Sequence, residues 1–464
     1  MSLFNINGKN IKLVDAYEVL DSRGFPTVAC EVTLVCGIKG KAMIPSGAST
    51  GSKEALELRD GDKKRYNGKG VLKAVQNVNR IIGPQIVGMN VCKQKEIDDF
   101  MIKLDGTVGK TKYGANAILA ISMAVAKAAA IVCKQPLYMY LRSLVPQCKD
   151  NQEFYLPVPM LNVINGGAHA DNTIDFQEFM FMPIGAKSMR QACQIASECF
   201  HTLGKILKDK GFNTSKGDEG GYAPLLKNAE EALQFMVEAI KTAGYKPGVD
   251  GDVAIALDCA ASELYDEVNK VYVFKKALNA GHLNKKQATM TSDQMVDYLI
   301  ELTKKYPIIS IEDGLAENDW TGFAKLTNLI GNKVQIVGDD LYCTNPQLLK
   351  EGISKKATNA VLIKLNQIGT LSETIQTIQT ARHNDPVWAA VVSHRSGETE
   401  DSFIADLAVS LNCGQIKTGS MSRSERICKY NRLMEIEDQL TNVRAIYPGV
   451  TTFKNLGYKN EIKH

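Results

Sequence analysis

Six short apolar runs in the last two-thirds of the chain each end on polar or charged residues. The runs are VAIALD, PIISIE, VQIVGDD, AVLIK, AAVVSH and GQIK, and they end at Asp258, Glu312, Asp339 with Asp340, Lys364, His394 and Lys417. After Asp258 the ends fall 54, 27, 25, 30 and 23 residues apart, and the shorter spacings match one strand plus one helix. In a closed parallel barrel the carboxyl ends of the strands meet at one face, so this pattern predicts a single site.

Helical periodicity fills the stretches between the runs. Alternation of strands with amphipathic helices predicts a parallel sheet with crossover connections. The clearest helices are expected at 188–208, 229–242 and 292–305. Residues 11 to 60 instead predict strands joined by turns, with a helix starting near Lys53 and further helices around 70–90 and 114–133.

A polar and then proline-spaced stretch at 151–161 marks a domain boundary. We therefore expect an N-terminal domain over 1–150 and an α/β barrel over 151–464, a length that such barrels often need. The small, hydroxyl-rich segment 45–52 is typical of a mobile lid or an anion-binding loop.

Composition limits the classes of protein that fit. With 55 basic and 51 acidic residues the formal charge is only +4, which argues against a nucleic-acid surface. Eleven scattered cysteines suit free thiols in a reducing cytosol, and the first residues lack the apolar core of a secretory signal. The apolar stretch 115–133 carries Asn116, Ser122 and Lys127, which favours a buried helix over a membrane span. A cytoplasmic protein is expected.

Asp258, Glu312 and Asp339 are candidate metal ligands. Taken singly, such acidic residues are more often helix caps or solvated. Three at barrel spacing would repel one another unless a cation lay between them. Oxygen ligands favour a hard divalent ion, and Mg²⁺ is the natural candidate.

Lys364 is the candidate base. A lysine can accept a proton near neutral pH if burial and nearby cations such as Lys417 disfavour its charged form. A lysine that reaches solvent or pairs with a carboxylate is an equally good reading of this position alone. Glu219 in GDEGG and Glu178 in FQEFM are weaker candidates, since the glycine-rich stretch is more often a turn.

The stretch SHRSGETED, from Ser393 to Asp401, carries His394, Arg395 and Ser396. These donors, followed by the expected start of a helix, suit an anion such as phosphate. A helix cap with an ion pair explains the same residues equally well.

Taken together, long segments of the chain closely resemble the enolase family in its bacterial-type branch. The matching segments are DSRGFPTV, PSGASTGSKEALELRDGD, NVINGGAHADN, QEFM, GDEGGYAP, ALDCAASE, SIEDGLAENDW, LIKLNQIGTLSET, SHRSGETED and GQIKTGSMSRSER. The resemblance implies an N-terminal α+β domain on an eight-stranded α/β barrel, usually assembled as a homodimer. It also implies reversible dehydration of 2-phosphoglycerate to phosphoenolpyruvate with two Mg²⁺ ions in each site.

The resemblance assigns roles residue by residue. It makes Asp258, Glu312 and Asp339 ligands of the first Mg²⁺ and gives Ser49 to the second. Lys364 matches the base and Glu219 the acid, which must then carry a proton. The resemblance also places residues around the substrate, its phosphate and its carboxylate, namely His169, Gln177, Glu178, Asp340, Ser393, His394, Arg395, Ser396 and Lys417.

The chain departs from the family at its usual interface ion pairs. Tyr17 stands where an arginine commonly pairs with the acid matched by Glu425. Ala29 and Glu435 replace the acid and the arginine of a second pair. Exposed ion pairs are worth only about 0 to 1 kcal/mol each, so their loss weakens a dimer only modestly.

Three other functions fit parts of this pattern. The barrel could serve a related metal-dependent dehydratase or racemase of an acid sugar, although the SHRS, Ser49 and GDEGG matches favour a phosphorylated acid. Lys364 could form a Schiff base, as in an aldolase. A non-enzymatic surface-binding role is the remaining class, and the complete set of catalytic residues argues against it.

Overall fold

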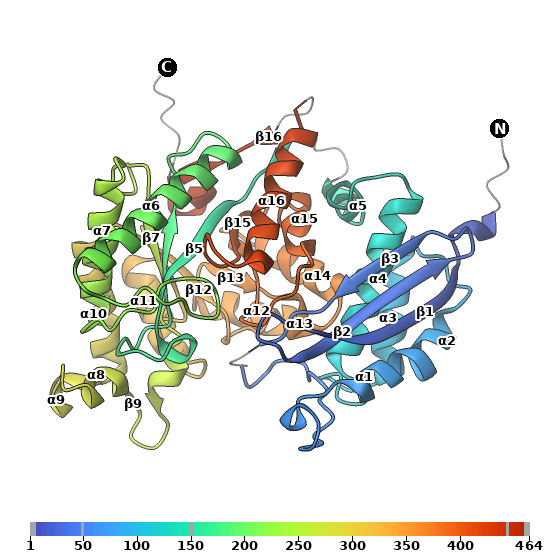
Figure 1. Cartoon of the computed structure of the whole chain (residues 1–464), viewed down its shortest axis with the longest axis horizontal. Helices are drawn as coiled ribbons and strands as arrows, with labels where there is room; N and C mark the ends of the chain where they lie inside the picture. Colours follow the sequence, from blue (N-terminus) through green and yellow to red (C-terminus); the bar gives the residue numbers. More distant parts are fainter. Residues whose placement is uncertain (1–5, 48–50, 149–152, 442–444, 459–464) are drawn as a thin grey trace.

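The computed structural model describes residues 6–47, 51–148, 153–441 and 445–458. Two bodies lie side by side, an N-terminal sheet with helices on the right of Figure 1 and a barrel on the left. The N-terminal sheet is antiparallel, with strands β1 (Ile11–Leu20), β2 (Pro26–Leu34) and β3 (Lys39–Met43). A closed barrel of eight strands forms the second body, which confirms the predicted α/β fold class.

Helix α4 (Ala115–Val132) covers the N-terminal sheet and packs on β2 and β3. Its mean hydropathy of 1.9 would suit a membrane span, but 83% of the helix is buried in the protein, as expected for a core helix. Gly40 lets the helix approach the sheet, because a Cβ atom at this position would lie 2.3 Å from the Ala128 nitrogen. The other helices of this body are α1 (Leu72–Gln76), a π-helical turn (Asn77–Ile82), α2 (Gly83–Ile86), α3 (Gln94–Asp105) and α5 (Leu137–Ser143).

The barrel strands follow the order β11-β12-β13-β14-β15-β5-β6-β7. Their bounds are Val158–Asn165 for β5, Glu178–Met182 for β6, Ala254–Asp258 for β7, Ile308–Glu312 for β11, Gln335–Gly338 for β12, Ala360–Ile363 for β13, Ala389–Ser393 for β14 and Gly414–Lys417 for β15. The six predicted runs are β7 and β11 to β15. Each run ends at the same mouth of the barrel, as the sequence indicated.

The expectation of an all-parallel barrel was wrong at β6, which pairs antiparallel with both β5 and β7. The chain passes from β5 to β6 through residues 166–177 without a crossover helix, and so short a connection returns the strand in the opposite direction. Between β6 and β7 the chain forms two helices, α6 (Met189–Asp209) and α7 (Ala229–Thr242). Glu178 therefore faces the mouth from the amino end of its strand.

The outer helices match the predicted amphipathic stretches closely. Besides α6 and α7 they are α10 (Ser292–Lys305), α11 (Trp320–Ile330), α12 (Pro346–Lys355), α13 (Leu365–Ile368), α14 (Leu371–Arg382), α15 (Phe403–Ser410) and α16 (Ser424–Gln439). The 54-residue spacing between Asp258 and Glu312 is longer than the others because an insertion follows β7. The insertion consists of β8 (Tyr265–Asp266), β9 (Val271–Val273), α8 (Lys275–Asn279), α9 (Lys285–Ala288) and β10 (Thr289–Met290). A short pair of β4 (Phe154–Tyr155) and β16 (Ala445–Ile446) joins the start of the barrel to its end.

One predicted helix start was wrong. Residues 51–65 contain no helix, and their charged and polar side chains bond to scattered partners such as Pro26 and Arg395. The helix expected after the SHRSGETED stretch is confirmed, because α15 begins at Phe403, two residues after Asp401. His394, Arg395 and Ser396 lie on the loop between β14 and this helix.

Candidate active site

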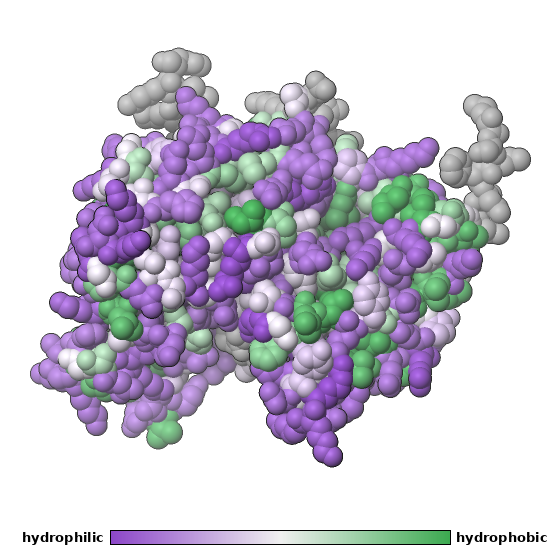
Figure 2. Space-filling model, viewed as in Figure 1, coloured by the Kyte–Doolittle hydropathy of each residue, from purple (hydrophilic) through white to green (hydrophobic). Residues whose placement is uncertain are grey.

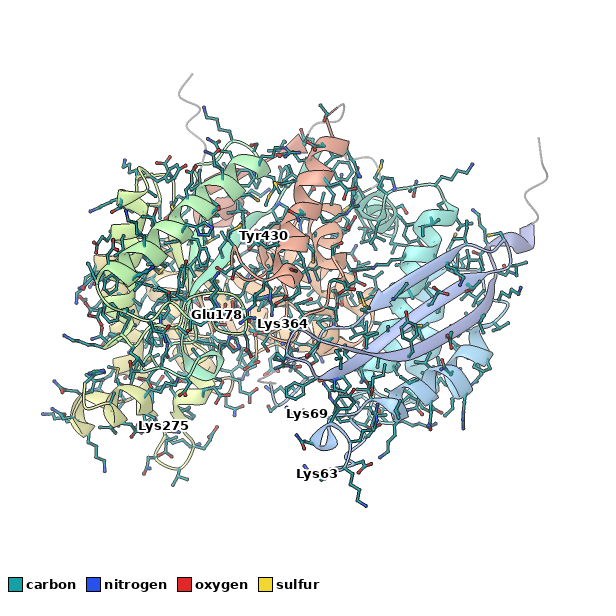
Figure 3. The ribbon with its side chains drawn as sticks, viewed as in Figure 1. Lys63, Lys69, Glu178, Lys275, Lys364 and Tyr430 are labelled. Atoms are coloured by element: carbon teal, nitrogen blue, oxygen red, sulfur yellow. The ribbon has the colours of Figure 1, made fainter. Side chains whose placement is uncertain are left out.

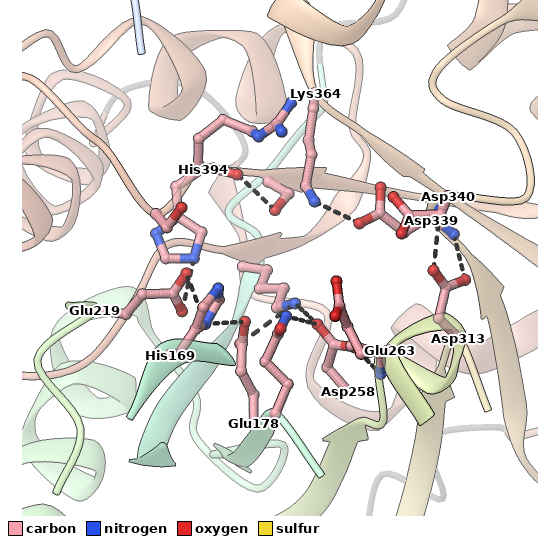
Figure 4. Close-up of a pocket in the computed structure, with 16 residues that line it drawn as sticks. His169, Glu178, Glu219, Asp258, Glu263, Asp313, Asp339, Asp340, Lys364 and His394 are labelled. Atoms are coloured by element: carbon pink, nitrogen blue, oxygen red, sulfur yellow. Dashed lines mark hydrogen bonds and ion pairs between the residues drawn. The ribbon is translucent and has the colours of Figure 1, made fainter. Parts of the chain in front are cut away.

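The predicted site residues converge on one pocket at the mouth of the barrel (Figure 4). Figure 3 places Glu178 and Lys364 near the middle of the molecule, beside the N-terminal body. The pocket is lined by His169, Gln177, Glu178, Glu219, Asp258, Ala260, Glu263, Asp313, Asp339, Asp340, Lys364, Ser393, His394, Arg395, Ser396 and Lys417. Glu312 lies directly below it, fully buried and bonded to Lys417. Ser49 lies outside the described residues.

Lys417 connects the acidic side chains of the pocket floor. Its Nζ lies 2.7 Å from Asp258 Oδ2, 2.8 Å from Glu312 Oε1 and 3.3 Å from Glu178 Oε2. Burial lowers the pKa of Lys417, but the carboxylates around it outweigh burial and hold it well above its usual value. The residue is therefore a fixed positive charge at the bottom of the site.

Lys364 reaches the pocket from the end of β13 and bonds Asp339 Oδ2. Burial disfavours its charged form, as the sequence predicted, but the Asp339 carboxylate outweighs burial and raises its pKa. Asp339 also accepts from Gln367 Nε2 at 2.9 Å. Lys364 can therefore accept a proton near neutral pH only if another positive charge binds Asp339, so that the pKa of the lysine falls.

Glu178, Glu219 and two histidines form a second group. His169 Nδ1 lies 3.5 Å from Glu178 Oε1 and 3.6 Å from Glu219 Oε1, while His394 Nε2 lies 3.3 Å from Glu219 Oε2. Burial lowers the pKa of both histidines, that of His394 to about 4. Asn162 Nδ2 donates to Glu219 Oε2 at 2.9 Å.

The pKa values of Glu178 and Glu219 are shifted in opposite directions. Burial and the neighbouring Glu219 carboxylate raise the pKa of Glu178 well above its ordinary value. Burial also acts to raise the pKa of Glu219, but His394 and His169 outweigh it and the pKa falls well below its ordinary value. These opposite directions favour a proton on Glu178, whereas the sequence resemblance implies one on Glu219.

Arg395 is the most constrained member of the predicted phosphate segment. Its guanidinium makes a bidentate pair with Glu54, at 2.8 Å to Oε2 and 3.1 Å to Oε1, and both side chains are buried. Ser46 and Gly397 exchange two main-chain hydrogen bonds, of 2.7 and 2.9 Å. Segment 45–47 is thereby fixed beside the SHRS residues.

The donor set fits a hard divalent cation. Seven acidic side chains line the pocket against the cationic Lys364, Arg395 and Lys417, so negative charge is in excess. Glu312 Oε2 is buried and has no hydrogen-bond partner among the described residues. Carboxylate oxygens of this kind suit Mg²⁺ better than softer metals.

The tightest acidic clusters differ from the predicted ligand triad. Ligand atoms of His169, Glu178 and Glu219 lie within 4.8 Å of one another, as do those of Asp313, Asp339 and Asp340. Lys417 lies between Asp258 and Glu312, and Lys364 is paired with Asp339. Asp258, Glu312 and Asp339 thus lie at the same mouth of the barrel, but each is bonded to a lysine side chain.

Several residues of the site were not predicted. Asp313 accepts from the backbone nitrogens of Asp339 and Asp340 at 2.8 and 2.9 Å, and its position directly after Glu312 could have suggested it. Glu263 lines the pocket from the turn after β7. Glu54 gave no local signal, because its partner Arg395 is 341 residues away in the sequence.

Burial and the charge of Asp339 raise the pKa of Asp340 to about 8, so this predicted substrate contact is largely protonated at neutral pH. Gln177 Nε2 lies 3.5 Å from Asp258 Oδ2 and faces the pocket beside it. Both residues line the pocket, and their contact with substrate stays a prediction.

Comparison with known proteins decides the family. A model described as "Enolase, N-terminal domain" matches residues 11–141, and one described as "Enolase, C-terminal TIM barrel domain" matches residues 153–456. The chain belongs to the enolase family. Family membership makes it a phosphopyruvate hydratase, which interconverts 2-phospho-D-glycerate and phosphoenolpyruvate in glycolysis.

Curated enolases resemble the chain along nearly its whole length. The enolase of Malacoplasma penetrans is 64% identical over 443 residues, which cover 96% of this chain and 98% of the relative. That of Mycoplasmoides gallisepticum is 64% identical over 460 residues, covering 98% and 95%. The enolase of Mycoplasma genitalium is 60% identical over 459 residues, covering 99% of each chain.

Proposed function

We propose that the pocket performs the enolase reaction with Lys364 as base, Glu219 as acid and Mg²⁺ as cofactor. The observation that carries this proposal is that Lys364 and Glu219 line one pocket from different sides (Figure 4). A base and an acid on opposite sides of a bound substrate are what an elimination needs.

Asp258, Glu312 and Asp339 would hold one Mg²⁺, and Ser49 is expected to join a second. When bound, the ions neutralise the charge that develops on the substrate carboxylate as the C2 proton leaves. Enolase-superfamily sites with a Lys or His base and Mg²⁺ are a standard example of this chemistry, so the assignment of Lys364 is not an independent discovery.

The chain's own groups supply the proton movements. Lys364 Nζ would take the proton from C2, and the C3 hydroxyl would leave as water with a proton from Glu219. The raised pKa of Glu178 favours a proton beside Glu219, and His169 lies within 3.6 Å of both carboxylates. We therefore expect the proton of the pair to move to Glu219 when substrate arrives.

The remaining contacts would bind the two charged ends of the substrate. Arg395, with Ser396 beside it, suits the phosphate, because a guanidinium binds such oxygens with two hydrogen bonds. Lys417 suits the carboxylate. Phosphate binding at Arg395 would compete with Glu54, which accepts from both terminal guanidinium nitrogens.

A single assay tests the proposal. Phosphoenolpyruvate absorbance should rise with 2-phosphoglycerate and Mg²⁺, stop with EDTA, and recover when Mg²⁺ is restored. A panel of acid sugars should give no turnover, and borohydride with a carbonyl substrate should give no adduct at Lys364. Activity on the sugars alone, or full activity in EDTA, would overturn the proposal.

We further propose a cytoplasmic homodimer whose domains divide at residues 150 and 151. The gap between the two family matches, at 142–152, supports the division. Apolar side chains at the outer face of the N-terminal sheet support the dimer, since Leu13 is 53% and Tyr17 38% exposed. Figure 2 shows hydrophobic residues at several places over this body.

A further inference from the structure

Arg426, in the first turn of α16, is a fully buried arginine behind the active site. Its Nη1 lies 2.6 Å from His394 Nδ1 and donates to the Arg395 carbonyl at 2.6 Å. Its Nη2 donates to the Ser396 carbonyl at 2.6 Å and lies 3.4 Å from the Asp218 carbonyl. One guanidinium thus joins the SHRS loop to the GDEGG loop.

The chemistry of the guanidinium decides the tautomer of His394. Arginine stays protonated in proteins and offers only donors. A ring nitrogen 2.6 Å from Nη1 must therefore accept the hydrogen bond with its lone pair. The proton of the neutral imidazole is then left on Nε2, which lies 3.3 Å from Glu219 Oε2 and has no hydrogen-bond partner among the described residues.

The surroundings leave little room for another arrangement. A Cβ atom at Gly419 would lie 2.8 Å from Arg426 Cδ and 2.9 Å from the Glu219 carbonyl, so the three segments are in close contact. The Ser420 nitrogen donates to that same carbonyl at 3.0 Å. Movement of Arg426 would disturb both the histidine and the main chain of Glu219.

We propose that Arg426 is a positioning residue that fixes His394 as the Nε2–H tautomer and so directs a hydrogen-bond donor at Glu219. Arg426 touches no reacting atom and acts through His394. The consequence for catalysis rests on the proposed acid role of Glu219, whereas the tautomer assignment does not.

Nitrogen-15 NMR of the histidine rings tests the assignment in the whole protein. Only six histidines are present, and the His394 signal is identified by its loss in His394→Gln. We expect the wild type to show Nε2–H, Arg426→Met to gain a population with Nδ1–H, and Arg426→Lys to restore part of the original form. An Nδ1–H or doubly protonated His394 in the wild type would overturn the proposal, even if Arg426→Met failed to fold.

A kinetic ratio separates positioning from general damage. Lys364 should still exchange the C2 proton with deuterated solvent in Arg426→Met, while loss of the C3 hydroxyl slows by about 10²-fold. The rate of C2 proton exchange divided by the rate of phosphoenolpyruvate formation should therefore rise. Arg142→Met is the matched control, because Arg142 is also buried and donates to main-chain carbonyls, at Ser410 and Glu153, away from the pocket.

The outcomes are distinct. A raised ratio in Arg426→Met and an unchanged ratio in Arg142→Met support the proposal. A changed tautomer with an unchanged ratio supports the positioning of His394 and overturns the acid role of Glu219. An unchanged tautomer in Arg426→Met overturns the positioning role.

Discussion

Single residues in the pocket show where the sequence was informative and where it was not. Some of them could be found because each ends an apolar run, namely Asp258, Glu312, Asp339, Lys364 and Lys417. Arg426 could not, since the hydrogen-bond partners of its guanidinium lie 30 to 208 residues away and no local pattern distinguishes a buried arginine. The sequence also could not predict which of Glu178 and Glu219 binds a proton more readily, because the pKa shift of each depends on the charges that surround it.

Lys364→Ala should lower turnover per folded molecule by about 10²- to 10⁴-fold, as loss of a positioned base does, while the secondary structure is kept. Phosphoenolpyruvate absorbance and circular dichroism measure the two quantities. Lys110→Ala is the control, since Lys110 is also buried and paired with a carboxylate, Glu373, but lies outside the pocket. It should lose stability and keep its turnover per folded molecule. Near-normal activity in Lys364→Ala would refute the base role.

At the scale of elements, hydrophobic periodicity located strands and helices but did not fix their directions. Helices α7 and α10 have the predicted bounds, and the six runs are strands. The antiparallel direction of β6 was not predicted, because the pattern of hydrophobic and polar positions is the same whichever way a strand runs. Its direction follows from the length of the connection, which becomes clear only when β5 and β6 are known to be neighbours.

Helices α3 and α14 meet through a buried carboxylate that links the two bodies. Asp98 accepts from Ser372 nitrogen at 3.0 Å and Ser372 Oγ at 2.6 Å, at the start of α14. Burial outweighs these hydrogen bonds and raises the pKa of Asp98 to about 6 from 3.8. A raised carboxyl pKa means that its stabilising effect is complete below pH 3.8 and is lost as pH rises through about 6.

Asp98→Asn should therefore become more stable relative to the wild type as pH rises, by about 2 kcal/mol between pH 4.5 and 7.5. Urea unfolding at both pH values measures this difference. Gln94, which donates to Asp98 at 3.2 Å, can turn its amide to accept from the new asparagine. The control is Asp99→Asn, because Asp99 is exposed and paired only with Lys95 at the surface. Equal pH dependence in the two variants would contradict the assignment.

At the scale of the whole molecule, the proposed dimer would use the outer face of the N-terminal sheet. Ala29 lies between Tyr17 and Met43 in the sheet register and is fully buried, so it offers no charge to a partner. Tyr17 instead contacts Lys41, whose ammonium lies 5.2 Å from its ring centre. Glu435 pairs with Arg432 of its own helix at 2.9 Å. The family's usual ion pairs are thus replaced by contacts within one subunit.

Sedimentation velocity should show a dimer with twice the chain mass of 50.8 kDa. Tyr17→Glu should weaken the dimer by about 10-fold or more, because it replaces an apolar ring in the contact by a charge that must lose its water on association. Val268→Glu is the control, since Val268 is 88% exposed on the distant β8–β9 turn. A monomer at all concentrations would contradict the proposed assembly.

The seam between β15 and β5 has a consequence for biosynthesis. Val158 and Pro159 pair with Gln415 and Ile416, which leave the ribosome roughly 250 residues later. At ordinary translation rates the edge of β5 waits roughly 10 to 50 seconds for its neighbour, a period in which open strand edges can aggregate. Pro159 has no amide hydrogen to offer a foreign strand, so the nascent chain carries its own protection against mispairing until the last barrel strand arrives.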